Sequence, residues 1–93
     1  MSTRDHAIAS HVLLFLAQGQ ARGRATRLDE LAIRVGARRE DVRDVVTRLH
    51  REGHVDAARM RLTMSGLALA ASLRGCKLPD VRPAERDSQM NVA

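Results

Sequence analysis

The sequence predicts one small, mainly α-helical domain with a single short β-hairpin. Its 93 residues leave room for one domain. Four stretches carry apolar residues every three or four positions, which is helical spacing, and glycines separate them. After Gly53 the apolar residues alternate with polar ones, which is typical of strands. The expected domain covers residues 1–75. Residues 76–93 contain both prolines and no apolar periodicity, so they are expected to form a flexible tail.

The first helix is expected to begin at Ser2 or Thr3, either of which can cap it, and to end near Gln18. Gly19 follows as the predicted stop, and residues 20–25 have the composition of a polar loop. The predicted core stripe of this helix contains Ile8, Val12, Phe15 and Leu16.

Two further helices are predicted with a tight turn between them. One begins near Thr26 or Arg27 and ends at Gly36, and the other covers about residues 39–52. A turn over residues 36–38 joins them, which makes a helix-turn-helix. Their predicted core residues are Leu28, Leu31, Ala32, Val35, Val42, Val45, Val46 and Leu49.

The hairpin is expected over residues 55–62, with its turn near Ala58 and Arg59. Thr63 is then placed to cap a fourth helix over about residues 64–74. The first helix and the helix-turn-helix would share a three-helix core.

The charge of the chain favours an acidic partner. The formal net charge is +5, and 15 of the 16 basic residues are arginine. Arginine matches phosphate and guanine edges, although a GC-rich genome also raises its frequency. The chain has one Phe and no Tyr or Trp. Because single-stranded nucleic acids are usually held by stacking on aromatic side chains, duplex DNA is the expected partner.

The sequence gives no indication of an enzyme, a cofactor, a metal or a small-molecule ligand. His50 and His54 are four residues apart, but Gly53 separates them and no carboxylate partner accompanies them. Cys76 is the single cysteine, so no internal disulfide can form, which fits a cytoplasmic protein. The longest apolar run, residues 12–17, is too short to cross a membrane, and no secretion signal is recognisable.

Three segments resemble small bacterial winged helix-turn-helix transcriptional regulators, including those of the multiple-antibiotic-resistance-regulator type. They are LDELAIRVG (28–36), VRDVVTRLHREG (42–53) and LTMSGLALA (62–70), and the resemblance covers about residues 5–75. It implies a sequence-specific DNA-binding domain in which the hairpin is a short wing. The base-reading residues that it implies are Arg38, Arg39, Arg43 and Thr47.

Arginines before the second helix and in the hairpin would flank the DNA groove and neutralise phosphates. These are Arg22, Arg24, Arg27, Arg59 and Arg61. Acidic residues on the third helix leave an alternative open. Unless Asp44 pairs with Arg48 or Arg51, it would repel phosphate, so a winged-helix module that binds another protein is the second hypothesis.

Four leucines remain after the core stripes are assigned, on the first and last helices. They are Leu13, Leu14, Leu69 and Leu73. On the fourth helix, Leu69 and Leu73 are expected opposite Leu67 and Ala71. An apolar patch of this size is unusual on a monomer, so the sequence predicts a homodimer built from these two helices.

Overall fold

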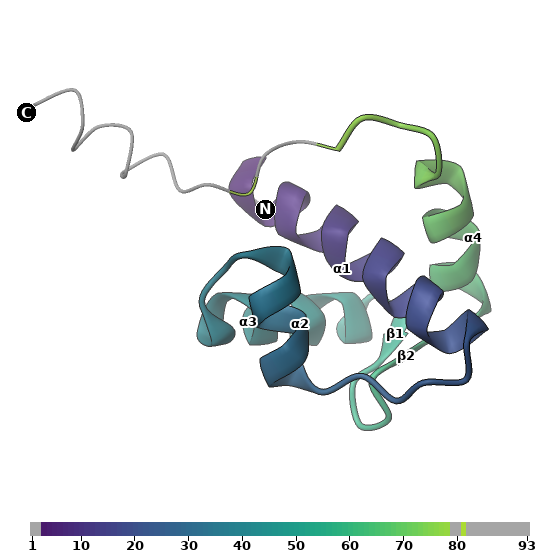
Figure 1. Ribbon diagram of the computed structural model, residues 1–93, viewed down its shortest axis with the longest axis horizontal. Helices are drawn as coiled ribbons and strands as arrows, with labels where there is room; N and C mark the ends of the chain where they lie inside the picture. The colour runs from purple at the N-terminus through teal and green to yellow at the C-terminus, as the bar shows by residue number, and fades with distance from the viewer. Residues whose placement is uncertain (1–2, 79–80, 82–93) are drawn as a thin grey trace, which may run out of the picture.

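A computed structural model describes residues 3–78 and residue 81, and it confirms a mainly helical domain with a small hairpin (Figure 1). The two strands are antiparallel and pair Val55 with Leu62. The elements are α1 (Thr3–Ala21), α2 (Leu28–Val35), α3 (Arg39–Arg51), β1 (Val55–Asp56), β2 (Arg61–Leu62) and α4 (Met64–Leu73). No helix in this part of the chain has the length and apolar character needed to cross a bilayer.

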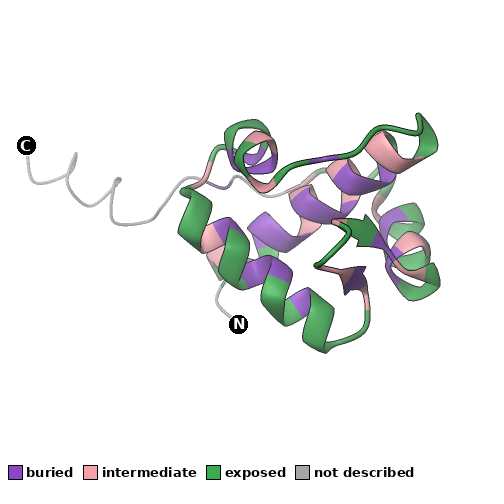
Figure 2. Cartoon of the chain, turned by 90° about the horizontal axis from the view of Figure 1, so that it is seen from below, coloured by how far each residue is buried: buried purple, intermediate pink, exposed green. Residues whose placement is uncertain are grey.

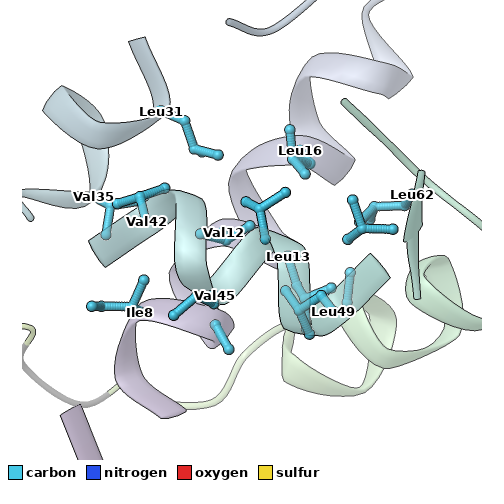
Figure 3. Close-up of a cluster of buried hydrophobic side chains, with 14 of the residues drawn as sticks. Ile8, Val12, Leu13, Leu16, Leu31, Val35, Val42, Val45, Leu49 and Leu62 are labelled. Carbon is cyan, nitrogen blue, oxygen red and sulfur yellow. The ribbon is translucent and has the colours of Figure 1, made fainter. Parts of the chain in front are cut away.

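Helix α1 is the centre of the domain, because every other helix and strand β2 pack against it (Figure 1). Its buried surface is therefore wider than the one predicted stripe. Leu13, which we expected on an exposed face, is only 5% exposed and belongs to the core, so this prediction is wrong (Figure 3). Phe15, expected in the core stripe, is only partly buried.

Helix α1 also continues past its predicted stop at Gly19. A glycine is needed at this position because Thr26 packs closely against it. A Cβ at residue 19 would lie 2.9 Å from the Thr26 hydroxyl oxygen. Gln20, expected in a loop, lies on the last turn of α1 and binds the hairpin. The Leu62 backbone N–H donates to Gln20 Oε1 at 2.9 Å, and Gln20 thus satisfies an edge group of β2.

Helices α2 and α3 lie close to their predicted ranges, with a tight turn between them. Gly36 follows α2 in the left-handed conformation, with φ of +82°, and its N–H donates to the Ala32 carbonyl at 2.9 Å. The inward faces of α2 and α3 meet α1 in one cluster, to which β2 adds Leu62 (Figure 3). All four predicted core residues of α3 are buried, namely Val42, Val45, Val46 and Leu49.

Helix α4 begins with the predicted Thr63 cap, whose hydroxyl accepts a hydrogen bond from the Gly66 N–H at 3.2 Å. Its fully buried positions are Gly66 and Ala70, whereas the predicted inward residue Ala71 is exposed. A Cβ at Gly66 would lie 1.9 Å from the His54 carbonyl oxygen, so α4 rests directly on the backbone that precedes the hairpin. This contact, rather than the leucine pattern, fixes how α4 is rotated.

The four leucines assigned to a dimer surface do not form one exposed patch. Besides the buried Leu13, Leu14 and Leu73 are partly buried against the core, and only Leu69, at 38% exposure, is classed as exposed. Within the predicted tail, Val81 is 5% exposed and joins the core cluster. The packed unit therefore extends beyond residue 75, and the rest of the segment after residue 78 lies outside the described residues.

Candidate nucleic-acid interface

The outward face of α3, the helix that leads into the hairpin, is exposed along its length (Figure 2). One-sided burial of Val42, Val45 and Leu49 leaves the polar residues of α3 facing solvent. Among the described residues, no acidic side chain pairs with the arginines of this face beyond the first turn. These arginines are Arg43, Arg48 and Arg51.

The first turn of α3 differs, because its predicted base-reading arginines have acidic partners. Arg39 forms an ion pair with Asp29 of α2. Arg38 contacts Asp41 at 3.3 Å and Glu40 at 3.6 Å. The side chains of Arg38 and Arg39 are still 74% and 61% exposed, so these pairs are weak and exchangeable in water.

Asp41 is the least exposed member of this acidic group, with 19% of its side chain accessible. It joins α3 to α1 through a 3.0 Å contact with Arg4 and also accepts from Arg38. Burial is the largest single influence and raises the pKa of Asp41. The hydrogen bonds and charges of Arg4 and Arg38 together outweigh it, so the pKa lies below its usual value. Asp41 therefore stays ionised and serves the packing of α3 on α1.

Asp44 lies on the exposed face of α3, where a pair with Arg48 or Arg51 would reduce its repulsion of phosphate. Neither Arg48 nor Arg51 forms an ion pair with it in the part of the chain that the structure describes. Among the residues that the structure describes, the face thus combines Thr47, arginines that form no ion pair and the carboxylate of Asp44, which forms none either. Such a surface has hydrogen-bond donors for guanine and an acceptor for the amino group of cytosine.

The arginines predicted to contact phosphate fall into two groups. Arg22, Arg27 and Arg61 are exposed and have no acidic partner among the described residues. Arg24 instead pairs with Glu30 at 2.8 Å, and Arg59 lies 3.9 Å from Asp56. Each group has members on both segments that are expected to flank the DNA groove, namely the hairpin and the loop that leads from α1 into α2.

Sequence reasoning missed how the hairpin is fixed to the end of α3. The Nδ1 atom of His50 lies 3.0 Å from the Val55 carbonyl oxygen and 3.1 Å from the Ala57 nitrogen. Asp56 Oδ1 accepts from the Ala58 N–H at 3.1 Å and so shapes the turn. In the described residues, no three His, Cys, Asp or Glu side chains lie close enough together to hold a metal ion.

His54 has a structural contact of its own, a hydrogen bond between its Nδ1 atom and the Ser65 hydroxyl of α4. The two histidines therefore point to different elements. His50 holds the hairpin and His54 holds the start of α4, so together they fix both segments that follow α3.

Comparison of the chain with protein-family models, curated proteins and solved structures finds no match. The features of this surface that bear on its function are the exposed arginines on α3, together with those of the α1–α2 loop and of the hairpin.

Proposed function

We propose that the protein binds duplex DNA in a sequence-specific manner, as a small bacterial winged helix-turn-helix transcriptional regulator. The observation that carries this proposal is the outward face of α3, where Arg43, Arg48 and Arg51 are exposed and form no ion pair with any acidic residue that the structure describes. An unpaired arginine can bind an acidic partner without first losing a competing ion pair. An exposed helix with such side chains fits the width of the major groove.

The order of the elements supports the winged-helix interpretation. Three helices are followed by a two-stranded hairpin and a fourth helix, and the turn between α2 and α3 is tight. In this arrangement α3 enters the major groove and the hairpin is the wing. Because each strand of the hairpin has two residues, the wing would touch the phosphate backbone rather than reach deep into the minor groove.

The proposed contacts divide by role. Arg43 and Thr47 would read base edges, while Arg38 and Arg39 would have to exchange their carboxylate partners for DNA. Phosphate would be bound by the flanking arginines of the α1–α2 segment and the wing, which supply affinity without sequence information. These flanking residues are Arg22, Arg24, Arg27, Arg59 and Arg61.

The salt dependence of binding tests this proposal. Fluorescence anisotropy with fragments selected from a genomic library should give a slope of log K against log salt of about −4 to −5, if the five flanking arginines each neutralise one phosphate. The same fragments as single strands should bind much more weakly, because the chain has no Tyr or Trp and its single Phe, Phe15, is partly buried against the core. Equal affinity for both forms, or a slope near zero, would contradict the proposal.

A winged-helix module for protein interaction remains the second hypothesis, and two observations favour it. Ile33 on α2 is 79% exposed, and Asp44 on α3 has no cationic partner among the described residues. An apolar contact at Ile33 would be insensitive to salt. If Ile33→Ser abolishes capture of a protein partner while the purified chain binds no duplex at low salt, this second function replaces the first.

Homodimerisation also remains a prediction. Of the four leucines that suggested it, only Leu69 is exposed. Leu14 and Leu73 are partly buried, and Leu13 belongs to the core. Two-fold symmetry would place two recognition helices about one DNA turn apart. Light scattering at micromolar concentration tests this directly, and a monomer at all concentrations would rule the dimer out.

A further inference from the structure

Helix α3 contains three acidic residues, and two of them have a partner in the fold. Asp41 contacts Arg4 at 3.0 Å and so fastens α3 to α1. Glu40 lies 3.6 Å from Arg38. The third, Asp44, is exposed and forms no hydrogen bond or ion pair with any residue that the structure describes. The packing of α3 therefore does not require a carboxylate at this position.

Asp44 lies near the centre of the outward face of α3. Thr47 and Arg51 follow it three and seven positions later, which is the spacing of one helix face. The buried residues of the helix lie on the opposite side, and they are Val42, Val45, Val46 and Leu49. Asp44 also belongs to the first half of α3, and the first half of a recognition helix is the part that contacts base edges. If α3 enters the major groove, this carboxylate faces the bases.

The chemistry of a carboxylate selects among the four bases. A carboxylate accepts hydrogen bonds and cannot donate them. In the major groove guanine presents acceptors, thymine presents an acceptor and a methyl group, and adenine presents an acceptor beside its amino group. Cytosine presents a donor alone, its N4 amino group. The carboxylate of Asp44 is therefore matched by cytosine, whereas each of the other bases places an acceptor against it.

The residues beside Asp44 keep this face attractive to DNA. Arg43 precedes it and Arg48 lies one turn further along, and both are exposed and form no ion pair with a described acidic residue. The carboxylate between them still repels phosphate, and this repulsion is offset only where a cytosine offers its amino group. A repulsive group of this kind produces specificity, because it weakens binding to every duplex that lacks the matching base.

We propose that Asp44 makes the protein specific for cytosine at one position of its DNA site, by accepting a hydrogen bond from the N4 amino group. This role rests on the proposed DNA binding, because the side chain meets a base only if α3 enters the major groove. It differs from the role of Arg43, whose donors attract guanine. Asp44 instead excludes duplexes without a C·G pair at the position that faces the middle of α3.

Selection of duplexes from a randomised library by the wild type and two variants tests this role. The wild type should select cytosine at one position, and Asp44→Ala should lose that preference and keep all others. In anisotropy titrations of a selected duplex, changing this C·G pair to T·A should weaken the wild type about tenfold and leave Asp44→Ala unaffected. Asp44→Asn should prefer adenine at the same position, because an amide can donate to N7 of adenine and accept from its amino group.

Glu52→Gln is the matched control for the change in charge. Glu52 is exposed, follows the last residue of α3 and forms no ion pair within the described chain, so its replacement should keep every base preference. If Asp44→Ala binds all duplexes more tightly without a change at any position, the carboxylate only repels phosphate and the proposed role is wrong. An unchanged selection by Asp44→Ala would overturn it equally. Failure of the wild type to bind any duplex would instead overturn the proposed function, and the cytosine preference with it.

Discussion

The two ends of α3 are held to the rest of the molecule by different kinds of contact. At its start, ion pairs join Asp41 to Arg4 of α1 and Arg39 to Asp29 of α2. At its end, the backbone is clamped by hydrogen bonds and by direct packing. The Thr63 hydroxyl donates to the Gly53 carbonyl at 2.7 Å, and Gly66 lies against the His54 carbonyl.

This difference explains why some arginines of α3 are held in ion pairs while others are available to bind a partner. Where acidic residues fasten the start of α3, they occupy Arg38 and Arg39. Because the end of α3 is fastened without charges, Arg48 and Arg51 stay without acidic partners in the described chain, as does Arg43 in the second turn. We therefore expect changes in salt or pH to weaken the contacts at the start of α3. Substitutions that disturb packing should instead weaken the contacts at its end.

The largest expected effect comes from Gly66→Ala. The added Cβ would lie 1.9 Å from the His54 carbonyl oxygen, which belongs to the backbone and cannot move away alone. We expect a loss of about 3 kcal/mol in the free energy of unfolding, measured by urea denaturation. Ala68→Ser adds an atom at an exposed position of the same helix and should stay within about 0.5 kcal/mol of wild type. Comparable stability of the two variants would show that α4 does not depend on the close contact between Gly66 and the His54 carbonyl.

Arg43→Ala should weaken specific DNA binding about tenfold or more, since a good arginine–guanine pair contributes about 1 to 3 kcal/mol. Arg39→Ala should have a smaller effect, because Arg39 must give up Asp29 before it contacts a base. Anisotropy titrations of both variants on one selected duplex compare them directly. A larger loss for Arg39→Ala would reverse the assignment of paired and available arginines. Neither substitution touches the core, so circular dichroism should be unchanged.

Asp41→Asn should lower the free energy of unfolding by about 1 kcal/mol at pH 7, because hydrogen bonds to a charged partner are lost. The pKa of Asp41 is lowered in the folded protein below its usual 3.8. Its contribution is therefore fully present above pH of about 5, where the unfolded carboxyl is also ionised, and it disappears as pH falls through the folded pKa. Denaturation at several pH values should show the two proteins converging in acid. A constant difference down to pH of about 2 would contradict this role.

The smallest effect is expected for the exposed pair of Arg39 and Asp29. Asp29→Asn should change the free energy of unfolding by about 0.5 kcal/mol or less, and added salt should remove the difference. The same variant should strengthen DNA binding slightly, because Arg39 is then released. Urea denaturation at low and high salt measures the first effect, and anisotropy measures the second. Weaker DNA binding by this variant would mean that the ion pair positions Arg39 productively.

The regular helices show where sequence reasoning succeeds. The buried residues of α3 recur on one face only, so their spacing predicted both its limits and its outward residues. Helix α1 is buried over a wider arc, and the single-stripe interpretation wrongly placed Leu13 outside the core. A stripe at helical spacing identifies a helix with one covered side. It does not identify one that is covered by several neighbours.

The glycines likewise differ in whether a local pattern or a tertiary contact explains them. Gly36 ends α2 in a left-handed conformation, as a local signal predicts. Gly19 and Gly66 are needed because other segments approach them closely, and no local pattern distinguishes that use from a helix stop.

The sequence by itself determined the number and order of helices, the tight turn between α2 and α3, the Thr63 cap and the excess of arginine, because each follows from local spacing or from composition. Only the tertiary structure decided which arginines are available. Arg4 and Asp41 are 37 positions apart, and Arg39 and Asp29 are 10 apart. Pairing over such distances depends on how the helices pack, so it decides which positive charges remain free to bind a partner.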